Sequence, residues 1–189
     1  MLLYKDIVKE GNEVLRLKAQ EVKFPLDEET LNELELMDEY LRNSYDPKFE
    51  GNKDIRPGVG IAAPQIGVSK QMFAIMAYDE AGNFHHYIVV NPKIVSHSEE
   101  KVYLPDGEGC LSVDRKCEGL IHRAKRIKAK AMVYDFEKEE FVQTELKLQN
   151  YIAIVFQHEY DHLKGTLFVD HINQADPFKV VENSKPIKF

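Results

Sequence analysis

The segment that most constrains this chain is the run from Gln157 to Gly165, in which His158 and His162 stand four residues apart. On a helix, side chains at this spacing project from one face, so both imidazoles can bind a single metal ion. Glu159 lies within about 60° of His162 around such a helix, close enough to move protons for a water on that metal. The run therefore predicts a helix that carries a metal site, with a metal-dependent hydrolase as the leading hypothesis.

The residues before the motif indicate that this run is helical. Tyr151, Ile154 and Val155 precede the two histidines at three- and four-residue steps, which is the period of one helix face. Gly165 suits the end of the helix, because glycine readily adopts the left-handed conformation found there. The alternative is an ordinary helix with unrelated histidines, since short motifs recur by chance.

A site with two histidines needs a third protein ligand. One class of zinc proteases places a third histidine where this chain has Phe168, so that class does not fit. The only glutamate downstream is Glu182, in an irregular, proline-flanked tail. Cys110 is the remaining candidate, because a thiolate with two imidazoles is a catalytic ligand set. Its alternative role is that of a small buried apolar side chain.

A third block, Gly58 to Gln65, combines two glycines with small alanines and ends in a glutamine. Glycine allows the backbone to approach a ligand closely. The Gln65 amide can donate a hydrogen bond to an oxyanion. The block lacks the Gly-Lys-Ser/Thr ending of a phosphate-binding loop, and alone it indicates only a turn of small residues.

Together these blocks resemble the three signature motifs of the peptide deformylase family, G-x-G-x-A-A-x-Q, E-G-C-L-S and Q-H-E-x-D-H-L-x-G. They stand in that order along the chain, and the resemblance covers nearly its whole length. Residues 42–56 and 91–98 are similar to the subgroup common in Gram-positive bacteria. The departures from the family pattern lie outside the candidate ligands, at Ile61, Asp106, Cys117 and Glu118.

The resemblance implies removal of the formyl group from the N-terminal formyl-methionine of new polypeptides, so N-formyl-methionyl peptides are the expected substrates. It implies one divalent metal held by Cys110, His158 and His162, with Glu159 taking up and delivering the proton. Thiolate and imidazole accept several ions, so we expect Fe²⁺ in the cell and Zn²⁺, Ni²⁺ or Co²⁺ in purified protein.

The resemblance also assigns residues to the substrate. The Gln65 amide and the backbone N–H of Leu111 would stabilise the oxyanion. Gly60 and Leu111 would form a tight wall that excludes an acetyl group, and backbone groups of Val59 and Gly109 would pair with the peptide like an added strand. Core packing is the alternative role for the apolar residues that we expect to line the methionine pocket. These are Val59, Tyr151, Ile154 and Val155.

Two rival functions remain open at this point. A zinc endoprotease would need a different third ligand. A structural metal site would normally have four protein ligands, and the only other thiol is that of Cys117. A disulfide between Cys110 and Cys117 would destroy the catalytic site.

Length and charge limit the other possibilities. A chain of 189 residues suits a single catalytic domain over residues 1–189. No run approaches the ~18 apolar residues of a membrane span and the start lacks a signal-peptide core, so we expect a cytoplasmic protein with no membrane contact. A net charge of −7 argues against DNA binding. We interpret the basic run 123–130 as a solvated strand face, with a ribosome contact as the alternative.

The hydrophobic pattern predicts an α+β fold, in which antiparallel strands pack around a central metal-binding helix as in peptide deformylases. A first helix should begin after Asp27 and continue through Leu41. Val180, Val181 and Ile187 are expected to supply a terminal strand. The other expected strands span residues 71–78, 86–90, 93–97, 101–104, 127–134, 142–148 and 167–169.

Overall fold

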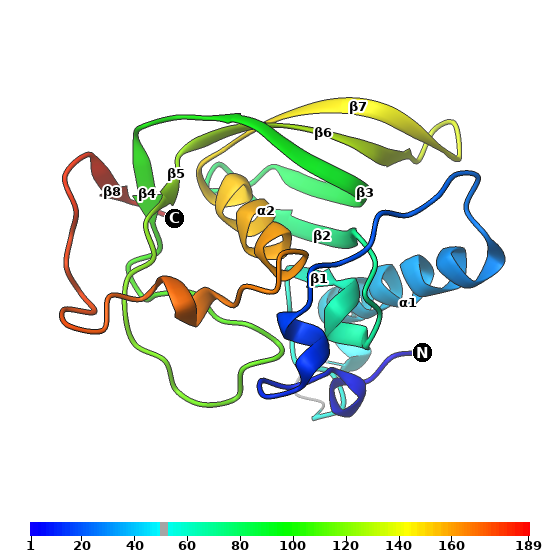
Figure 1. Ribbon diagram of the computed structural model, residues 1–189, viewed down its shortest axis with the longest axis horizontal. Coiled ribbons are helices and arrows are strands. Elements are labelled where there is room, and N and C mark those ends of the chain that lie inside the picture. The colour runs from blue at the N-terminus through cyan, green and yellow to red at the C-terminus, as the bar shows by residue number, and fades with distance from the viewer. Residues whose placement is uncertain (50–52) are drawn as a thin grey trace.

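A five-stranded antiparallel sheet forms the centre of the structure, a computed structural model that describes residues 1–49 and 53–189 (Figure 1). Its strands lie in the order β1-β2-β3-β6-β7, and every neighbouring pair is antiparallel. The two strands expected at 86–90 and 93–97 form one continuous β3, which shifts register near Lys93. The strands are β1 (Gly60–Ala62), β2 (Met72–Tyr78), β3 (Phe84–His97), β6 (Arg126–Asp135) and β7 (Glu140–Gln149).

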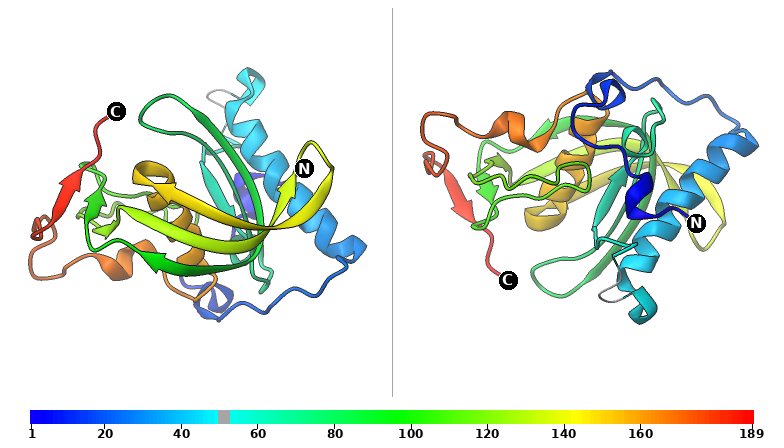
Figure 2. Two further views of the ribbon diagram at one scale, coloured as in Figure 1. Left: turned by 90° about the horizontal axis from the view of Figure 1, so that it is seen from above. Right: turned by 90° about the horizontal axis from the view of Figure 1, so that it is seen from below.

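The two long helices cover opposite faces of this sheet (Figure 2). They are α1 (Glu28–Tyr45) and the histidine-bearing α2 (Asn150–His162). On β2, Met72 belongs to the same core cluster as Met37 of α1. The next residue, Phe73, points to the other face and meets Phe156 of α2 with ring centroids 5.0 Å apart. Because β2 is buried on both faces, its sequence is almost continuously apolar. Its contact with Phe156 packs the sheet against α2.

The ends of the two helices are held in different ways. Asp27 caps α1 as expected, since its side chain accepts a hydrogen bond from the Thr30 N–H at 2.8 Å. The start of α2 is held instead by Glu80 in the turn after β2, which contacts the side chain of Asn150 and the N–H of Tyr151. At its C-terminal end, Gly165 has φ +73°, and a Cβ there would lie 2.4 Å from the Arg16 carbonyl oxygen.

A second, three-stranded sheet lies beside α2, in the order β5-β4-β8 (Figure 1). Its strands are β4 (Lys101–Tyr103), β5 (Arg123–Ala124) and β8 (Ser184–Pro186), and β4 pairs with β8 in parallel. The terminal strand therefore lies just before the buried Ile187, and not at Val180–Val181 as predicted; Val180 is exposed.

The strand predicted at 167–169 is wrong, because this segment begins a short helical turn, η5 (Phe168–His171). The Asp170 side chain accepts a hydrogen bond from the Leu167 N–H at 2.9 Å, which closes the turn. Arg16 pairs with the same carboxylate and holds it in place. The other short helical turns are η1 (Tyr4–Asp6), η2 (Glu13–Arg16), η3 (Pro47–Phe49) and η4 (Ala63–Ile66).

The segment that resembles the Gram-positive insertion, residues 42–56, begins inside α1, which continues to Tyr45 and is followed by η3. Residues 50–52 of that insertion lie outside the described residues. Within the part of the chain that is described, none of the helices combines the length and apolar character needed to cross a bilayer.

Candidate metal centre

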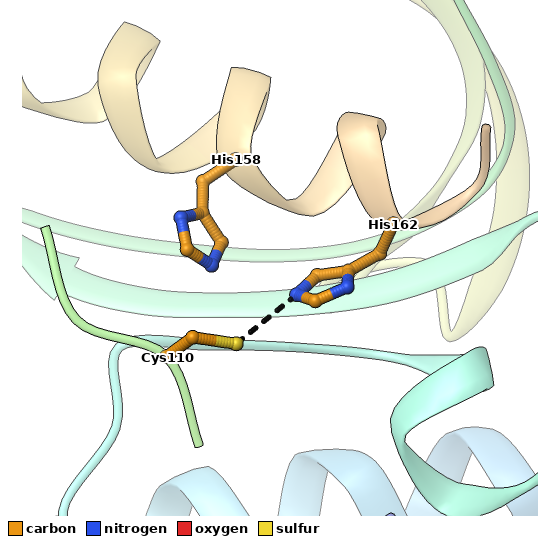
Figure 3. Close-up of side chains that lie close together, drawn as sticks. All are labelled: Cys110, His158 and His162. Atoms are coloured by element: carbon orange, nitrogen blue, oxygen red, sulfur yellow. Dashed lines mark hydrogen bonds between the residues drawn. The ribbon is translucent and has the colours of Figure 1, made fainter. Parts of the chain in front are cut away.

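Three candidate ligand atoms converge between α2 and the loop that follows β4 (Figure 3). Cys110, His158 and His162 each contribute one side-chain donor atom, and these three atoms lie within 4.8 Å of one another. The Sγ atom of Cys110 is 3.4 Å from Nε2 of His162. Cys110 and His162 are buried, and the side chain of His158 is 11% exposed. A thiolate and two imidazoles gathered in this way form a donor set that suits a divalent transition metal.

The two imidazoles occupy different electrostatic surroundings. Burial, followed by the neighbouring charge of His158, lowers the pKa of His162 to about 3, so its ring is neutral with a lone pair available. Burial also lowers the pKa of His158. The hydrogen bonds with Cys110 and Glu108 outweigh burial, so the pKa of His158 lies well above its usual value. Cys110 and Glu108 thus stabilise the charged form of the His158 ring.

The loop around Cys110 is a tight turn that presents the thiol to the helix. Cys110 forms an isolated bridge with Val113, whose N–H donates to the Cys110 carbonyl at 3.2 Å. The Ser112 N–H lies 3.5 Å from the sulfur. Upstream, Gly107 has φ +79°, and a Cβ there would lie 2.9 Å from the Gly119 carbonyl oxygen. Cys110 and Cys117 are both free thiols.

A buried network of ion pairs holds the His158 ring through its Nδ1 atom. Nδ1 of His158 is 2.8 Å from Oε1 of Glu108. Arg123 donates two hydrogen bonds to the same carboxylate, at 2.6 and 2.8 Å, and a third to Asp161 at 2.9 Å. Burial alone would raise the pKa of Glu108, but Arg123 and His158 lower it to about 2. Figure 3 shows the other ring nitrogen of His158 directed toward Cys110 and His162.

Glu108, Asp161 and Arg123 carry charges that are ordinarily found in surface ion pairs. Their side chains are only 4%, 16% and 5% exposed, so these are not surface ion pairs. The network continues to His171, whose Nε2 is 2.8 Å from Oδ2 of Asp161. His171 was not predicted, because it lies in a turn outside the three motifs.

Glu159 is buried against the backbone of Gly60. A Cβ on Gly60 would lie 2.3 Å from Oε1 of the carboxylate, so only glycine leaves room for it. The other oxygen, Oε2, is buried and has no hydrogen-bond partner among the described residues. Burial raises the pKa of Glu159 to about 7, where a carboxylate can both accept and return a proton near neutral pH.

Gln65 has its amide held in one orientation. Its Oε1 accepts a hydrogen bond from the Ala62 N–H at 2.9 Å. Its Nε2 then faces the metal centre and donates to the sulfur of Cys110 at 3.4 Å and to the hydroxyl of Ser112 at 3.1 Å. Ser112 was not singled out from the sequence, although it stands inside the motif that contains Cys110. Its fully buried hydroxyl helps to orient Gln65.

A cavity of about 360 Å³ opens beside these groups. The six residues expected to bind substrate all line it: Val59, Gly60, Gly109, Tyr151, Ile154 and Val155. Among residues 1–49 and 53–189, a Cβ on Gly109 would meet no atom within 4 Å beyond its chain neighbours, so the backbone there faces open space. Sequence reasoning missed the lining residues that come from α1 and from the loops, which are Ser44, Tyr45, Arg56, Pro57 and Leu104.

Comparisons with known proteins agree with this geometry. The chain matches the family described as Polypeptide deformylase over residues 4–178. It is 46% identical over 188 residues to Peptide deformylase 2 of Bacillus anthracis, with 100% of each chain covered. The peptide deformylase of Thermotoga maritima superposes with a TM-score of 0.65 at 36% identity, covering 88% of this chain and 96% of that one.

A third match adds a ligand. It is the structure of a class I type b peptide deformylase from Acinetobacter baumannii bound to Met-Ala-Ser. The TM-score is 0.69 and the identity 29%, with 88% of this chain and 96% of that one covered.

Proposed function

Because the chain belongs to the peptide deformylase family, we propose a role for each residue of its site. The enzyme is a metal-dependent hydrolase that removes the N-formyl group from newly synthesised polypeptides and releases formate. The observation that carries the assignment is the convergence of one thiol and two imidazoles within 4.8 Å, beside a buried carboxylate. An acid–base residue next to a three-ligand metal site is the arrangement that amide hydrolysis requires.

Cys110, His158 and His162 would hold one divalent metal ion. The buried position of these donors and the support of His158 by Glu108 fit such an ion. Among the ions that thiolate and imidazole accept, we propose Fe²⁺ in the cell, with Zn²⁺, Ni²⁺ or Co²⁺ in its place in purified protein. When bound, the metal supplies Lewis-acid chemistry, which polarises a carbonyl and lowers the pKa of water from 15.7 to about 7.

Glu159 would act as the general base and then as the general acid during hydrolysis. It takes a proton from the attacking water as the new C–O bond forms at the formyl carbon. It then delivers that proton to the amine nitrogen as the C–N bond breaks, which leaves formate and a free N-terminus. Its pKa of about 7 supports both halves of this role, as does its Oε2, which has no hydrogen-bond partner in the part of the chain that the structure describes.

The formyl oxygen becomes an oxyanion during the attack, and two N–H donors would stabilise it. They are Nε2 of Gln65 and the backbone N–H of Leu111. Gln65 exchanges one of its present partners, the Cys110 sulfur or the Ser112 hydroxyl, for the oxyanion. A donor of this kind typically lowers the barrier by ~3 kcal/mol.

The cavity walls suggest how the substrate would be selected. Gly60 and Leu111 both line the cavity, and as a tight wall they would admit a formyl hydrogen but exclude an acetyl methyl group. Tyr151, Ile154 and Val155 offer an apolar surface for the methionine side chain, and Val59 completes it. A peptide as the occupant of this cavity is supported by the Acinetobacter baumannii relative, whose structure has Met-Ala-Ser bound.

The peptide backbone would lie extended between β1 and the cysteine loop, as an added strand. Gly109 contributes an open stretch of backbone on one side. On the other, Val59 is anchored because its carbonyl accepts the Met76 N–H at 2.9 Å. That bond fixes the wall against which the substrate packs.

We propose that the enzyme acts in the cytoplasm, where its substrates are made. Arg126, Lys128 and Lys130 alternate as exposed residues along β6, so we keep the solvated strand face over a ribosome contact for this part of the basic run 123–130. For Arg123 the expectation of a solvated position was wrong. Arg123 is buried in its pairs with Glu108 and Asp161. Arg126 pairs with Glu100 at 2.7 Å.

Formate release tests the proposed function. Protein loaded with Fe²⁺ under anaerobic conditions would be given formyl-Met-Ala-Ser and, separately, acetyl-Met-Ala-Ser. The account predicts catalytic formate from the first and no acetate from the second. A fully loaded protein that releases no formate, or that cleaves unformylated peptides internally, would overturn it. The second outcome would restore the endoprotease alternative.

A further inference from the structure

Three aromatic side chains form an exposed cluster at the edge of the substrate cavity. Tyr45 ends α1, Tyr78 ends β2 and Phe84 begins β3, and they are 42%, 53% and 50% exposed. Their ring centroids lie 6.2 Å (Tyr45 to Tyr78), 6.5 Å (Tyr45 to Phe84) and 5.0 Å (Tyr78 to Phe84) apart. Figure 2 shows the C-terminal end of α1 beside the hairpin that joins β2 and β3. Exposed apolar groups gathered in this way mark an interaction surface.

The cluster is continuous with the cavity through Tyr45. This residue lines the cavity and also contacts both other rings. Its hydroxyl donates a hydrogen bond to the Met76 carbonyl oxygen at 2.8 Å, which fixes the ring. The Met76 N–H in turn donates to the carbonyl of Val59, a residue of the cavity wall that directly precedes β1. Tyr45 is therefore a rigid part of that wall, and a chain that left the cavity past Tyr45 would next reach Tyr78 and Phe84.

We infer that Tyr45, Tyr78 and Phe84 form a platform for an apolar or aromatic side chain of the substrate polypeptide, several residues after the methionine; this inference rests on the proposed function. New polypeptides extend well beyond a tripeptide, and six extended residues span ~20 Å. Aromatic rings bind one another edge to face or offset, as these three already do.

Size favours the substrate over a protein partner. A stable protein interface takes about 800 Å² from each side. Beyond Phe84 the ring contacts continue through His86 to the exposed Phe136, away from the cavity lining. Tyr45 and the two rings that it contacts offer far less area than such an interface, and they adjoin the place where the polypeptide would be held. The platform would thus make the enzyme favour some formylated chains over others, according to substrate residues that lie away from the formyl group.

A peptide series tests the platform. Formate release would be measured for formyl-Met hexapeptides of alanine and serine that carry a single Phe, or Ser in its place, at position 3, 4, 5 or 6. We expect one position at which Phe raises kcat/KM about three- to tenfold over Ser, the range expected for one aromatic contact. In a Tyr78→Ser/Phe84→Ser double variant this ratio should fall to about one.

The controls separate the platform from folding and from catalysis. Phe178→Ser removes an equally exposed ring, 58% exposed, that belongs to neither the cavity nor the cluster, and should keep the wild-type ratio. Phe84→Leu keeps apolar bulk without the ring and should lower the ratio in part, which gives a second readout should the double variant not fold.

Several outcomes would overturn the platform. One is a wild-type ratio of one at every position, and another is a ratio that survives the double substitution. A third is a loss of dimers on sedimentation in the double variant, which would make the patch a contact between two copies. Absence of formate from every peptide would instead overturn the proposed function itself.

Discussion

A 2.8 Å hydrogen bond joins Oε1 of Glu108 to Nδ1 of His158, so the carboxylate that precedes the cysteine by two residues orients the first histidine of the helix. Glu108 is itself held by two N–H groups of Arg123. The cysteine loop and α2 are thereby locked to each other through a contact that does not involve a metal. A hydrogen bond to the second ring nitrogen of a metal-binding histidine fixes the orientation of the ring and makes the metal-binding nitrogen more basic.

Glu108→Gln should therefore weaken metal binding. The amide cannot satisfy both Arg123 and His158, so His158 loses its fixed orientation, and affinity should fall about 10- to 100-fold. Competition with a chelator, followed by metal analysis, measures the change. Glu118→Gln is a matched control, because Glu118 is an exposed residue that pairs with Lys116. Equal affinity in the two variants would contradict the role given to Glu108.

Arg123→Met should destabilise the fold. The substitution leaves Glu108 and Asp161 buried without their cation, at a cost of about 3–5 kcal/mol in the free energy of unfolding. Arg126→Met is the comparison, because its side chain is 52% exposed and its ion pair with Glu100 should contribute less than about 1 kcal/mol. Urea unfolding of both variants would show the difference. A loss for Arg123→Met no larger than that of the surface variant would refute the buried network.

Gly60→Ala should abolish most activity without removing the metal. The new Cβ would lie 2.3 Å from Oε1 of Glu159, so the carboxylate has to move. A displacement of about 1 Å in a reacting group can cost about 100-fold in rate. Formate release and metal content, measured on the same sample, distinguish this effect from loss of the site. Wild-type turnover in Gly60→Ala would show that the position of Glu159 is not critical.

Glu159→Gln should bind one metal ion per chain and yet lose turnover by about 10²- to 10⁴-fold, because the amide cannot accept the proton of water. Glu182→Gln, at an exposed position in the C-terminal segment, should behave like the wild type. The pair separates an enzyme from a structural metal site. Full turnover in Glu159→Gln would remove the proton-transfer mechanism.

The sequence predicted the parts of this molecule that follow a local period. His158 and His162 stand on one helix face, as their four-residue spacing requires, and the strand around Ala129 alternates between buried and exposed residues. The α+β class was predicted correctly from this periodicity, and the family was predicted correctly from the resemblance to its three motifs.

Other features depend on contacts between distant segments and have no local signal. Glu80 holds the start of α2 from a hairpin turn about seventy residues earlier. Tyr45 reaches the cavity because α1 ends beside β2. The misassigned run from Leu167 to Val169 shows a further limit: three apolar residues can be buried equally well by a strand or by a tight helical turn.

The central claim is that one thiolate and two imidazoles bind the same ion. X-ray absorption at the zinc edge of protein loaded with one Zn²⁺ per chain tests it most directly. The account predicts one sulfur at ~2.3 Å, contributed by Cys110, and two imidazole nitrogens at ~2.0–2.1 Å, contributed by His158 and His162. It also predicts that the sulfur is lost in Cys110→Ser and kept in Cys117→Ser. A spectrum without sulfur, or one whose sulfur disappears in Cys117→Ser, would contradict it.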